Sequence, residues 1–341
     1  MPEIPPVYVV KNKKSVWPKV LAGVLFLSLA GALLVSLIAN AVLIGQRGGE
    51  AVRSGQDRFS EIVVEGEGPE KIVLIPIRGL ITFSEGQSFW ERESMGKQAV
   101  ERLRAAGEDP AVKGVVLLID SPGGGITASD IIYHRVKELA ESGKVVVAAF
   151  EDLAASGGYY VACPADWIVA HPTTITGSIG VIIQTLNLEG LMGKIGIRDV
   201  TIKRGEEKDI LSPFRDLTAA EREMLEGVID EMYRRFLAVV SDGRHLEGDR
   251  LEAVAGGAIF TGTQALANDL VDEIGYRETA IARARELAGL EEATVIEYRR
   301  VYSFFDLFRG RLDRALPPAA GFDLQSLLKP STPRLLYLWT L

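Results

Sequence analysis

The longest uncharged stretch of the chain, residues 20–45, sets the strongest limit on how the protein is organised. It is rich in Leu, Val, Ala and Ile, and only Ser28, Ser36 and Asn40 interrupt it with polar side chains. About 20 apolar residues in a helix are enough to cross the hydrocarbon core of a membrane. Lysines outnumber acidic residues before the stretch, and such a bias keeps an N-terminus in the cytoplasm. We therefore expect one transmembrane anchor, with the following chain exported.

This anchor predicts a single-pass protein of the inner (cytoplasmic) membrane, with its main domain on the extracytoplasmic or periplasmic face. Ala39-Asn40-Ala41 resembles a signal-peptide cleavage site, so cleavage after export is the alternative. The apolar run is longer than a usual signal core, which favours a retained anchor. The predicted parts are a cytoplasmic tail at 1–19, the anchor at 20–45, a linker at 46–70, a main domain at 71–300 and a C-terminal tail at 301–341. The tail is expected to be flexible or to lie on the membrane surface.

Short apolar runs alternate with amphipathic segments through residues 71–300. Residues 112–120 are almost entirely apolar, as in a strand that is buried on both faces. The alternation predicts an α/β fold with parallel strands. The expected strands are 71–77, 112–120, 144–150, 166–170, 181–186, 200–203 and 295–298. The expected helices are 89–107, 127–141, one that starts within 155–163, 218–241 and 276–289.

Composition argues against several classes of site. The 341 residues carry a net charge of −8, which disfavours nucleic acid as a partner because phosphate binding needs a concentrated basic face. The single cysteine, Cys163, cannot form an intramolecular disulfide. The three histidines do not have a metal-ligand spacing. We therefore expect no metal and no cofactor.

Three glycine-containing loops follow predicted strands. They are D-S-P-G-G-G at 120–125, A-S-G-G-Y-Y at 155–160 and T-G-S-I-G at 176–180. The first is either a tight turn or a set of backbone N–H groups that stabilise an anion. In the second, Ser156 is either a helix N-cap or a nucleophile at a strand-to-helix turn. Taken alone, the third loop reads as a turn.

A serine nucleophile needs a base. His171 is the only histidine whose position suits this role, because His134 and His245 lie in predicted polar helices. The alternative is a lysine from the polar segment R-G-E-E-K-D-I at 204–210. The residues themselves leave this choice open.

The ordered set of these motifs resembles the signal peptide peptidase A family, in its short bacterial form with one N-terminal membrane segment. The segments S-P-F-R-D-L-T-A-A-E at 212–221 and F-T-G-T-Q-A at 260–265 add to the resemblance, which covers residues 71–300. It implies a ClpP/crotonase-like α/β fold of repeated β-β-α units. It also implies a homo-oligomeric ring or dome in which serine and lysine come from neighbouring protomers.

By this resemblance, Ser156 is the nucleophile and Lys208 the general base of a Ser-Lys dyad. Ser178 is the proton relay, and the N–H groups of Gly123 and Gly157 form the oxyanion hole. An ordinary lysine has a pKa near 10.4, so a base at neutral pH needs a fall of roughly three units, or about 4 kcal/mol. Burial in an apolar pocket supplies such a shift. The family has a small polar residue in place of Arg204, which leaves Lys203 as a competing base.

The expected function is a membrane-anchored serine endopeptidase that degrades leftover signal peptides and other extended peptides. Two other classes are a crotonase-like acyl-CoA enzyme and a non-catalytic membrane scaffold. The C-terminal tail is itself Leu-, Ala- and Pro-rich like a peptide substrate. It is therefore expected to enter an active site and be trimmed.

Overall fold

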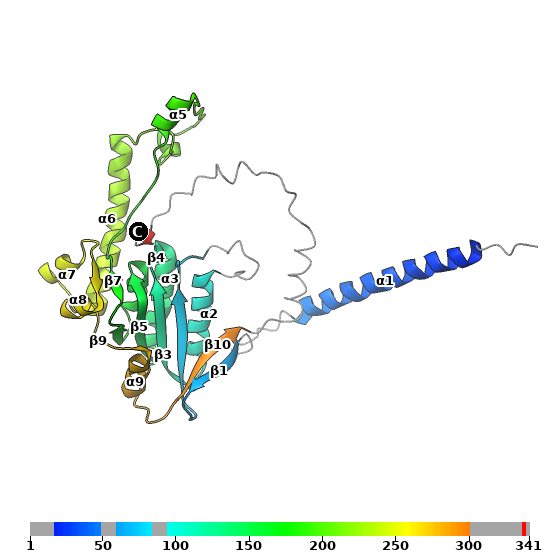
Figure 1. Ribbon diagram of the computed structural model, residues 1–341, viewed down its shortest axis with the longest axis horizontal. Helices are drawn as coiled ribbons and strands as arrows, with labels where there is room; N and C mark the ends of the chain where they lie inside the picture. The colour runs from blue at the N-terminus through cyan, green and yellow to red at the C-terminus, as the bar shows by residue number, and fades with distance from the viewer. Residues whose placement is uncertain (1–16, 49–58, 84–93, 301–335, 339–341) are drawn as a thin grey trace, which may run out of the picture. The chain divides into compact units, whose positions relative to one another are not determined.

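The computed structural model describes residues 17–48, 59–83, 94–300 and 336–338 (Figure 1). The chain divides into two units, Met1–Ser54 and Gly55–Leu341. In the first unit the predicted anchor lies within one helix, α1 (Trp17–Gly48). Within the part of the chain that the structure describes, no helix is both long and apolar enough to cross a membrane. The predicted transmembrane helix is therefore not supported here.

Nine strands of the described second unit form one sheet, in the order β1-β10-β2-β3-β5-β6-β9, with β7 paired to β5 and β8 paired to β7. Every pair from β10 to β9 along this order is parallel, while β1 and β8 run antiparallel to their partners. The predicted α/β class with parallel strands is confirmed. The strands are β1 (Phe59–Glu65), β2 (Lys71–Arg78), β3 (Val112–Ser121), β5 (Val145–Ala155), β6 (Trp167–Ala170), β7 (Ile175–Gly177), β8 (Ile259–Thr261), β9 (Glu273–Ile274) and β10 (Thr294–Arg300).

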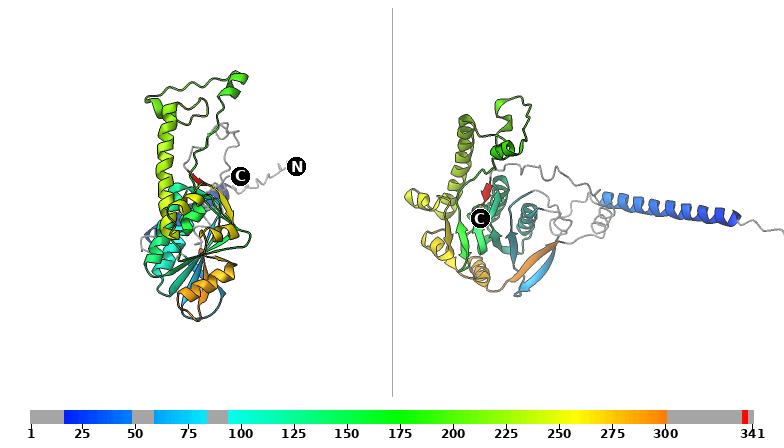
Figure 2. Two further views of the ribbon diagram at one scale, coloured as in Figure 1. Left: turned by 90° about the vertical axis from the view of Figure 1, so that its left-hand side faces the viewer. Right: turned by 45° about the horizontal axis from the view of Figure 1, so that its top comes forward.

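Helices cover both faces of this sheet (Figures 1 and 2). The core on one face joins β3 to α2 (Met95–Glu108), α3 (Ile126–Glu141) and α4 (Gly157–Ala162). The core on the other face joins it to α9 (Arg277–Leu287). Side chains of β3 enter the two cores alternately, as in Leu117 and Leu118, because successive residues of a strand point to opposite faces. Each such buried Leu contributes about 1.5–3 kcal/mol relative to an exposed one.

The remaining helices lie beyond β7. They are α5 (Glu189–Ile195), the 3₁₀ turn η2 (Glu206–Asp209), α6 (Ala219–Arg244), α7 (Asp249–Val254) and α8 (Gly262–Ala267). We call residues 183–217, which contain α5 and η2, the arm. In both views of Figure 2 α5 lies near one end of α6, away from the sheet.

Three sequence predictions are corrected. The expected strands at 181–186 and 200–203 do not form, apart from a single bridge at Ile182. Among the described residues no strand pairs with these two segments beyond that bridge, and Ile202 is 97% exposed. The expected linker at 46–70 contains β1, which pairs with β10. The helix expected at 89–107 starts at Met95, after an N-cap serine, and residues 84–93 lie outside the described residues.

Candidate active site

Ser156 stands at a sharp turn between a strand and a helix. Strand β5 ends at Ala155, and α4 begins at Gly157. Ser156 itself has φ 54° and ψ −116°, a backbone conformation that non-glycine residues rarely adopt. Strain of this kind clusters at functional positions, and it is the arrangement found at nucleophile elbows. Ser156 occupies the N-cap position of α4, but its side chain makes no capping hydrogen bond, so capping does not explain a serine at this position.

Ser178 lies beside Ser156 because their strands are neighbours. Ala155 of β5 pairs with Gly177 of β7, and each serine is the next residue along its strand. The Ser156 N–H donates to the Gly177 carbonyl at 2.8 Å. Ser178 also has a positive φ, of 52°, and its N–H donates to the Ala258 carbonyl at 2.7 Å. The structure thus brings the two predicted serines to one place.

The two predicted oxyanion glycines are in contact with each other. A methyl group on Gly157 would lie 3.2 Å from the Gly123 Cα and 2.5 Å from the Ser129 Oγ, so the site has no room for one. Gly123 lies in β4 (Gly123–Gly125) with φ 99°. Its N–H donates to the Ser121 Oγ at 3.1 Å. The Gly157 N–H is in the first turn of α4, where amides have no acceptor within the helix.

The chain's own C-terminal segment lies against these glycines. Strand β11 (Leu336–Leu338) pairs antiparallel with β4, so that Tyr337 faces Gly124. On its other side, Leu336 exchanges two backbone hydrogen bonds of 3.2 Å with Ile182. Three residues of the predicted tail therefore lie beside the candidate site, and the entry of the tail into an active site stays a prediction. The rest of the tail lies outside the described residues, and its trimming stays a prediction.

Lys208 is not joined to this cluster within one chain. It lies in η2 of the arm and is exposed, whereas Ser156 is 1% exposed. Among the described residues, no hydrogen bond or ion pair of the Lys208 side chain is found. The structure therefore brings together Ser156, Ser178 and the two glycines, and leaves Lys208 apart from them.

An arginine fixes the segment of Lys208 to the start of α6. The Arg215 guanidinium donates to the Asp209 carboxylate at 2.7 and 3.0 Å and to Glu221 at 2.8 Å. Glu221 also accepts from the Thr218 N–H, in a capping box that begins α6. Because Asp209 follows Lys208 directly, these contacts hold the lysine's backbone in place.

These contacts predict that the Glu221 carboxylate stays ionised at low pH. Hydrogen bonds from Arg215 and from the Thr218 backbone lower the pKa of Glu221 from 4.5 to about 2. The stability from these contacts is therefore complete above pH 4.5 and is lost as the pH falls through about 2. In an NMR titration of the wild-type protein, the Glu221 carboxyl carbon should stay at its ionised position down to about pH 3. Arg215→Ala should move the midpoint upward, whereas Arg222→Ala should leave it unchanged. An unmoved midpoint in Arg215→Ala would contradict this assignment.

The side chains of the other two predicted bases, Lys203 and His171, form contacts with residues other than Ser156. The Lys203 amine donates to the Asp209 carboxylate and to the Glu206 carbonyl, each at 2.6 Å. The His171 Nδ1 lies 2.8 Å from the Thr173 hydroxyl, and its ring packs edge-on against Tyr276. Among the described residues, no hydrogen bond links either side chain to Ser156.

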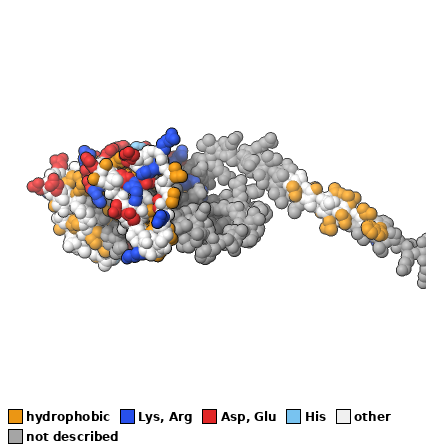
Figure 3. Space-filling view, turned by 90° about the horizontal axis from the view of Figure 1, so that it is seen from above, with side chains coloured by type: hydrophobic (Ala, Val, Ile, Leu, Met, Phe, Trp, Pro, Cys, Tyr) orange, Lys and Arg blue, Asp and Glu red, His pale blue; other side chains and the backbone are white. Residues whose placement is uncertain are grey.

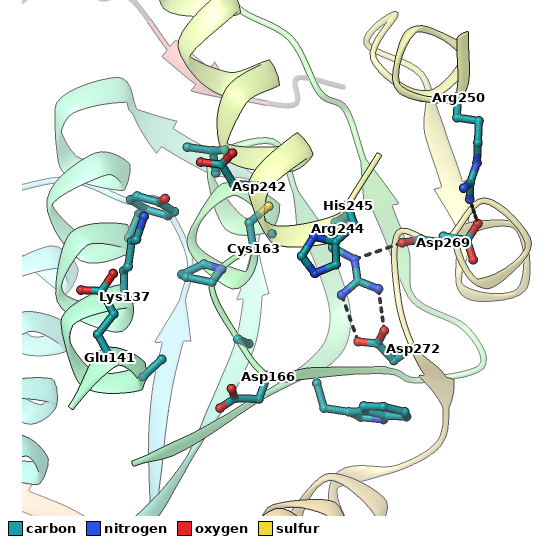
Figure 4. A pocket seen from close by; sticks show the side chains of 17 residues that line it. Lys137, Glu141, Cys163, Asp166, Asp242, Arg244, His245, Arg250, Asp269 and Asp272 are labelled. Carbon is teal, nitrogen blue, oxygen red and sulfur yellow. Dashed lines mark hydrogen bonds and ion pairs between the residues drawn. The ribbon is translucent and has the colours of Figure 1, made fainter. Parts of the chain in front are cut away.

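A large open hollow lies elsewhere on the domain (Figure 4). It has a volume of about 690 Å³ and includes Cys163, Arg244 and Asp272, but none of the predicted site residues. Arg244 forms a paired contact with the Asp272 carboxylate at 2.6 and 3.0 Å. Burial raises the pKa of the Cys163 thiol to about 12, so it is not a nucleophile at neutral pH. In the described residues no cluster of His, Cys, Asp and Glu is suited to a metal ion.

Comparison with known proteins identifies the family of this chain. The sequence pattern of peptidase family S49 matches residues 138–291. A protein of Enterococcus faecium, described as a candidate signal peptide peptidase SppA, is 39% identical over 240 residues, which are 70% of each chain. A candidate protease of Methanocaldococcus jannaschii is 38% identical over 270 residues, 78% of this chain and 83% of that one. The chain belongs to peptidase family S49. It is a serine peptidase of the SppA type, which favours the peptidase over the acyl-CoA enzyme and the scaffold.

Longer relatives match over one part only. Protease 4 of Haemophilus influenzae is 35% identical over 239 residues, which are 70% of this chain but 38% of that one.

The strand in the C-terminal tail, β11 (Leu336–Leu338), was not predicted from the sequence. Leu and aromatic residues alternate at 336–339, a pattern typical of a strand. The strand with which it pairs, β4, is far away in the sequence.

Proposed function

We propose that this S49 peptidase is an endopeptidase that cuts extended peptides, including leftover signal peptides, with a Ser156–Lys208 dyad. The single observation that carries this proposal is the strained conformation of Ser156 between β5 and α4, beside two glycines without room for a side chain. An extended segment paired with β4 is the second support, because peptides are commonly recognised by adding a strand to a free edge.

The proposed reaction follows from these positions. The Ser156 Oγ attacks the peptide carbonyl carbon, and its proton passes to the Lys208 amine with the help of Ser178. The N–H groups of Gly157 and Gly123 donate to the oxyanion, which requires the Gly123 amide to leave Ser121. Lys208 then protonates the leaving amine, which releases one peptide and leaves an acyl ester on Ser156. A water molecule gives a proton to Lys208 and attacks the ester carbonyl carbon. The bond from that carbon to the Ser156 Oγ then breaks, Lys208 returns the proton to the Oγ, and the second peptide leaves as the acid.

We further propose that Lys208 acts on the Ser156 of a neighbouring protomer. Six apolar side chains of the arm are exposed. They are Leu186, Leu191, Ile195, Ile197, Val200 and Ile202, with exposed fractions from 55% to 97%. On the face of the domain that Figure 3 shows, hydrophobic side chains lie beside charged ones. Exposed apolar side chains in one segment mark an interaction surface. A second protomer packed on the arm would also remove Lys208 from water, which a neutral lysine base needs. The proposed assembly is a homo-oligomeric ring or dome, and the proposed fold family is the ClpP/crotonase-like one.

Mixed oligomers test the shared site. Ser156→Ala and Lys208→Ala chains, each inactive alone, are expected to recover part of the wild-type peptide hydrolysis when they are co-expressed. Some interfaces then combine an intact serine with an intact lysine. Co-expressed Ser156→Ala and Ser156→Gly chains are the matched control and should stay inactive. If the first mixture is also inactive while both chains are folded and co-assembled, the dyad between protomers is wrong.

The membrane location is also proposed, from the sequence alone. The uncharged residues 20–45 and the lysines before them support an uncleaved anchor in the inner membrane, with the peptidase on the outer side. In alkaline carbonate extraction the full chain should stay with the membranes. Release into the supernatant would contradict an anchor.

A further inference from the structure

The carboxylate that follows Lys208 in the chain is directed at two cations of the arm. The Arg215 guanidinium donates to the Asp209 carboxylate at 2.7 and 3.0 Å, and the Lys203 amine donates to it at 2.6 Å. Only 17% of the Asp209 side chain is exposed. Hydrogen bonds from Arg215 and, to a lesser extent, from Lys203 lower the pKa of Asp209, so this carboxylate is ionised at neutral pH. Its negative charge is therefore compensated by cations other than Lys208.

Arg215 is itself held by a buried carboxylate. Its guanidinium donates to the Glu221 carboxylate at 2.8 Å and to the Asp216 carbonyl at 3.0 Å. The Glu221 side chain is 4% exposed and also accepts from the Thr218 N–H at 2.9 Å. A planar guanidinium with five N–H donors can bridge two carboxylates in this way, whereas a lysine amine is a point charge on a flexible stem. Arg215 therefore fixes the direction of the Asp209 side chain relative to α6.

A free carboxylate at Asp209 would oppose the proposed role of Lys208. Only a neutral amine can take the serine proton. A carboxylate within about 4–6 Å favours the protonated form of a lysine, and the attraction is stronger where both groups are shielded from water. Asp209 is the next residue along the chain, so a side chain released from Arg215 could reach the amine. The contacts of Arg215 prevent this pairing.

The other charged side chains beside Lys208 in the sequence are exposed. They are Arg204, Glu206 and Glu207, and among the described residues no ion pair includes them. Water and salt screen the charges of such exposed groups, so they act weakly on a neighbouring amine. Asp209 is therefore the carboxylate of this segment that is mostly removed from water and also adjacent to Lys208.

The alternative is that Arg215 only joins the arm to α6. In that case loss of Arg215 would lower peptide hydrolysis equally at every pH, and a second change at Asp209 would not restore it. The two roles therefore differ in how activity depends on pH.

We propose that Arg215 is a positioning residue for the proposed general base: it holds the Asp209 carboxylate away from the Lys208 amine, so that this amine can lose its proton near neutral pH. The inference rests on the proposed function, because Lys208 is taken to be the base that acts on Ser156.

The pH profile of peptide hydrolysis tests this role. Arg215→Ala should move the midpoint of the kcat/KM profile upward by at least about one pH unit, because the released Asp209 pairs with Lys208. Asp209→Asn in the same chain should reverse most of that change. Glu207→Gln, on the other side of Lys208, is the matched second change and should not reverse it. An unmoved midpoint in folded and assembled Arg215→Ala protein would overturn the proposal, as would equal reversal by both second changes or by neither.

Amine labelling gives a readout that does not depend on catalysis. The full-length Ser156→Ala protein is treated with trace acetic anhydride over a range of pH. Acetylation of Lys208 is then measured by mass spectrometry relative to Lys194, an exposed lysine of α5. Because only the neutral amine reacts, the midpoint for Lys208 should move upward with Arg215→Ala and return with Asp209→Asn.

The two readouts distinguish failure of this inference from failure of the proposed function. A midpoint of Lys208 labelling that moves with Arg215→Ala, in a protein that does not hydrolyse peptides with intact Ser156, would reject the dyad and retain the control of the Lys208 proton by Arg215. Hydrolysis that is lost in Lys208→Ala, with both midpoints unmoved by Arg215→Ala, would reject the inference and retain the dyad.

Discussion

Peptide hydrolysis by the Ser156→Ala protein is expected to fall by at least about 10³-fold, because removal of the proposed nucleophile leaves only the contribution of the proposed oxyanion hole and of binding. The measurement is kcat/KM on a fluorogenic peptide, together with labelling by a fluorophosphonate. Wild-type protein should be labelled and Ser156→Ala should not. The exposed Ser60 of β1 provides the matched control, and Ser60→Ala should keep both activity and labelling.

A second replacement at the same position separates chemistry from folding. Ser156 has φ 54°, a conformation that glycine adopts without strain. Ser156→Gly should therefore be as inactive as Ser156→Ala but thermally at least as stable. Full labelling of either protein would show that another serine is the nucleophile, and Ser178 would be the first to examine.

Replacement of Lys208 by alanine should also lower kcat by at least about 10³-fold at neutral pH, because the serine then has no base. Lys203→Ala is the matched control, since Lys203 is in the same arm but pairs with Asp209. It should retain most of the activity. Lys208→Arg should be as inactive as Lys208→Ala, because an arginine stays protonated in proteins.

The pH profile gives an independent check of this role. Wild-type kcat/KM should rise with pH through one ionisation that belongs to the base, because only the neutral amine accepts the serine proton. The small residual activity of Lys208→Ala should lack that ionisation and depend instead on hydroxide. If Lys203→Ala is the variant that removes the ionisation, the base is Lys203.

The first two glycine loops and the strands that lead into them were predictable from local sequence, whereas β7, which leads into the third loop, was not predicted. Apolar runs such as residues 112–120 indicated strands buried on both faces, and β3 was found with that burial. The same patterns in the sequence placed Ser156 between a strand and a helix. The position of Ser156 beside Ser178 follows from the parallel pairing of β5 and β7 in the structure. The resemblance to a family then assigned their roles.

The secondary structure of the arm was predicted wrongly from the sequence. Residues 181–186 and 200–203 have the β-branched composition of strands, but a strand forms only when a neighbour satisfies its backbone groups. Among the described residues the arm has no such neighbour, and Ile202 is 97% exposed. The composition of these residues therefore predicted the wrong secondary structure.

The sequence by itself determined the α/β class, the three glycine loops and the candidate serine, because each depends on residues close together along the chain. Only the tertiary structure decided that Lys208 lies apart from Ser156 within one chain, and that Tyr337 is buried beside Gly123 and Gly157. Lys208 is more than fifty positions from Ser156, and Tyr337 is more than one hundred and fifty positions from the two glycines. No local sequence pattern specifies relations over such separations. The physical reason is that the pairing of β11 with β4 and the packing of Tyr337 against Tyr160 and Phe236 exist only once α4 and α6 are packed together.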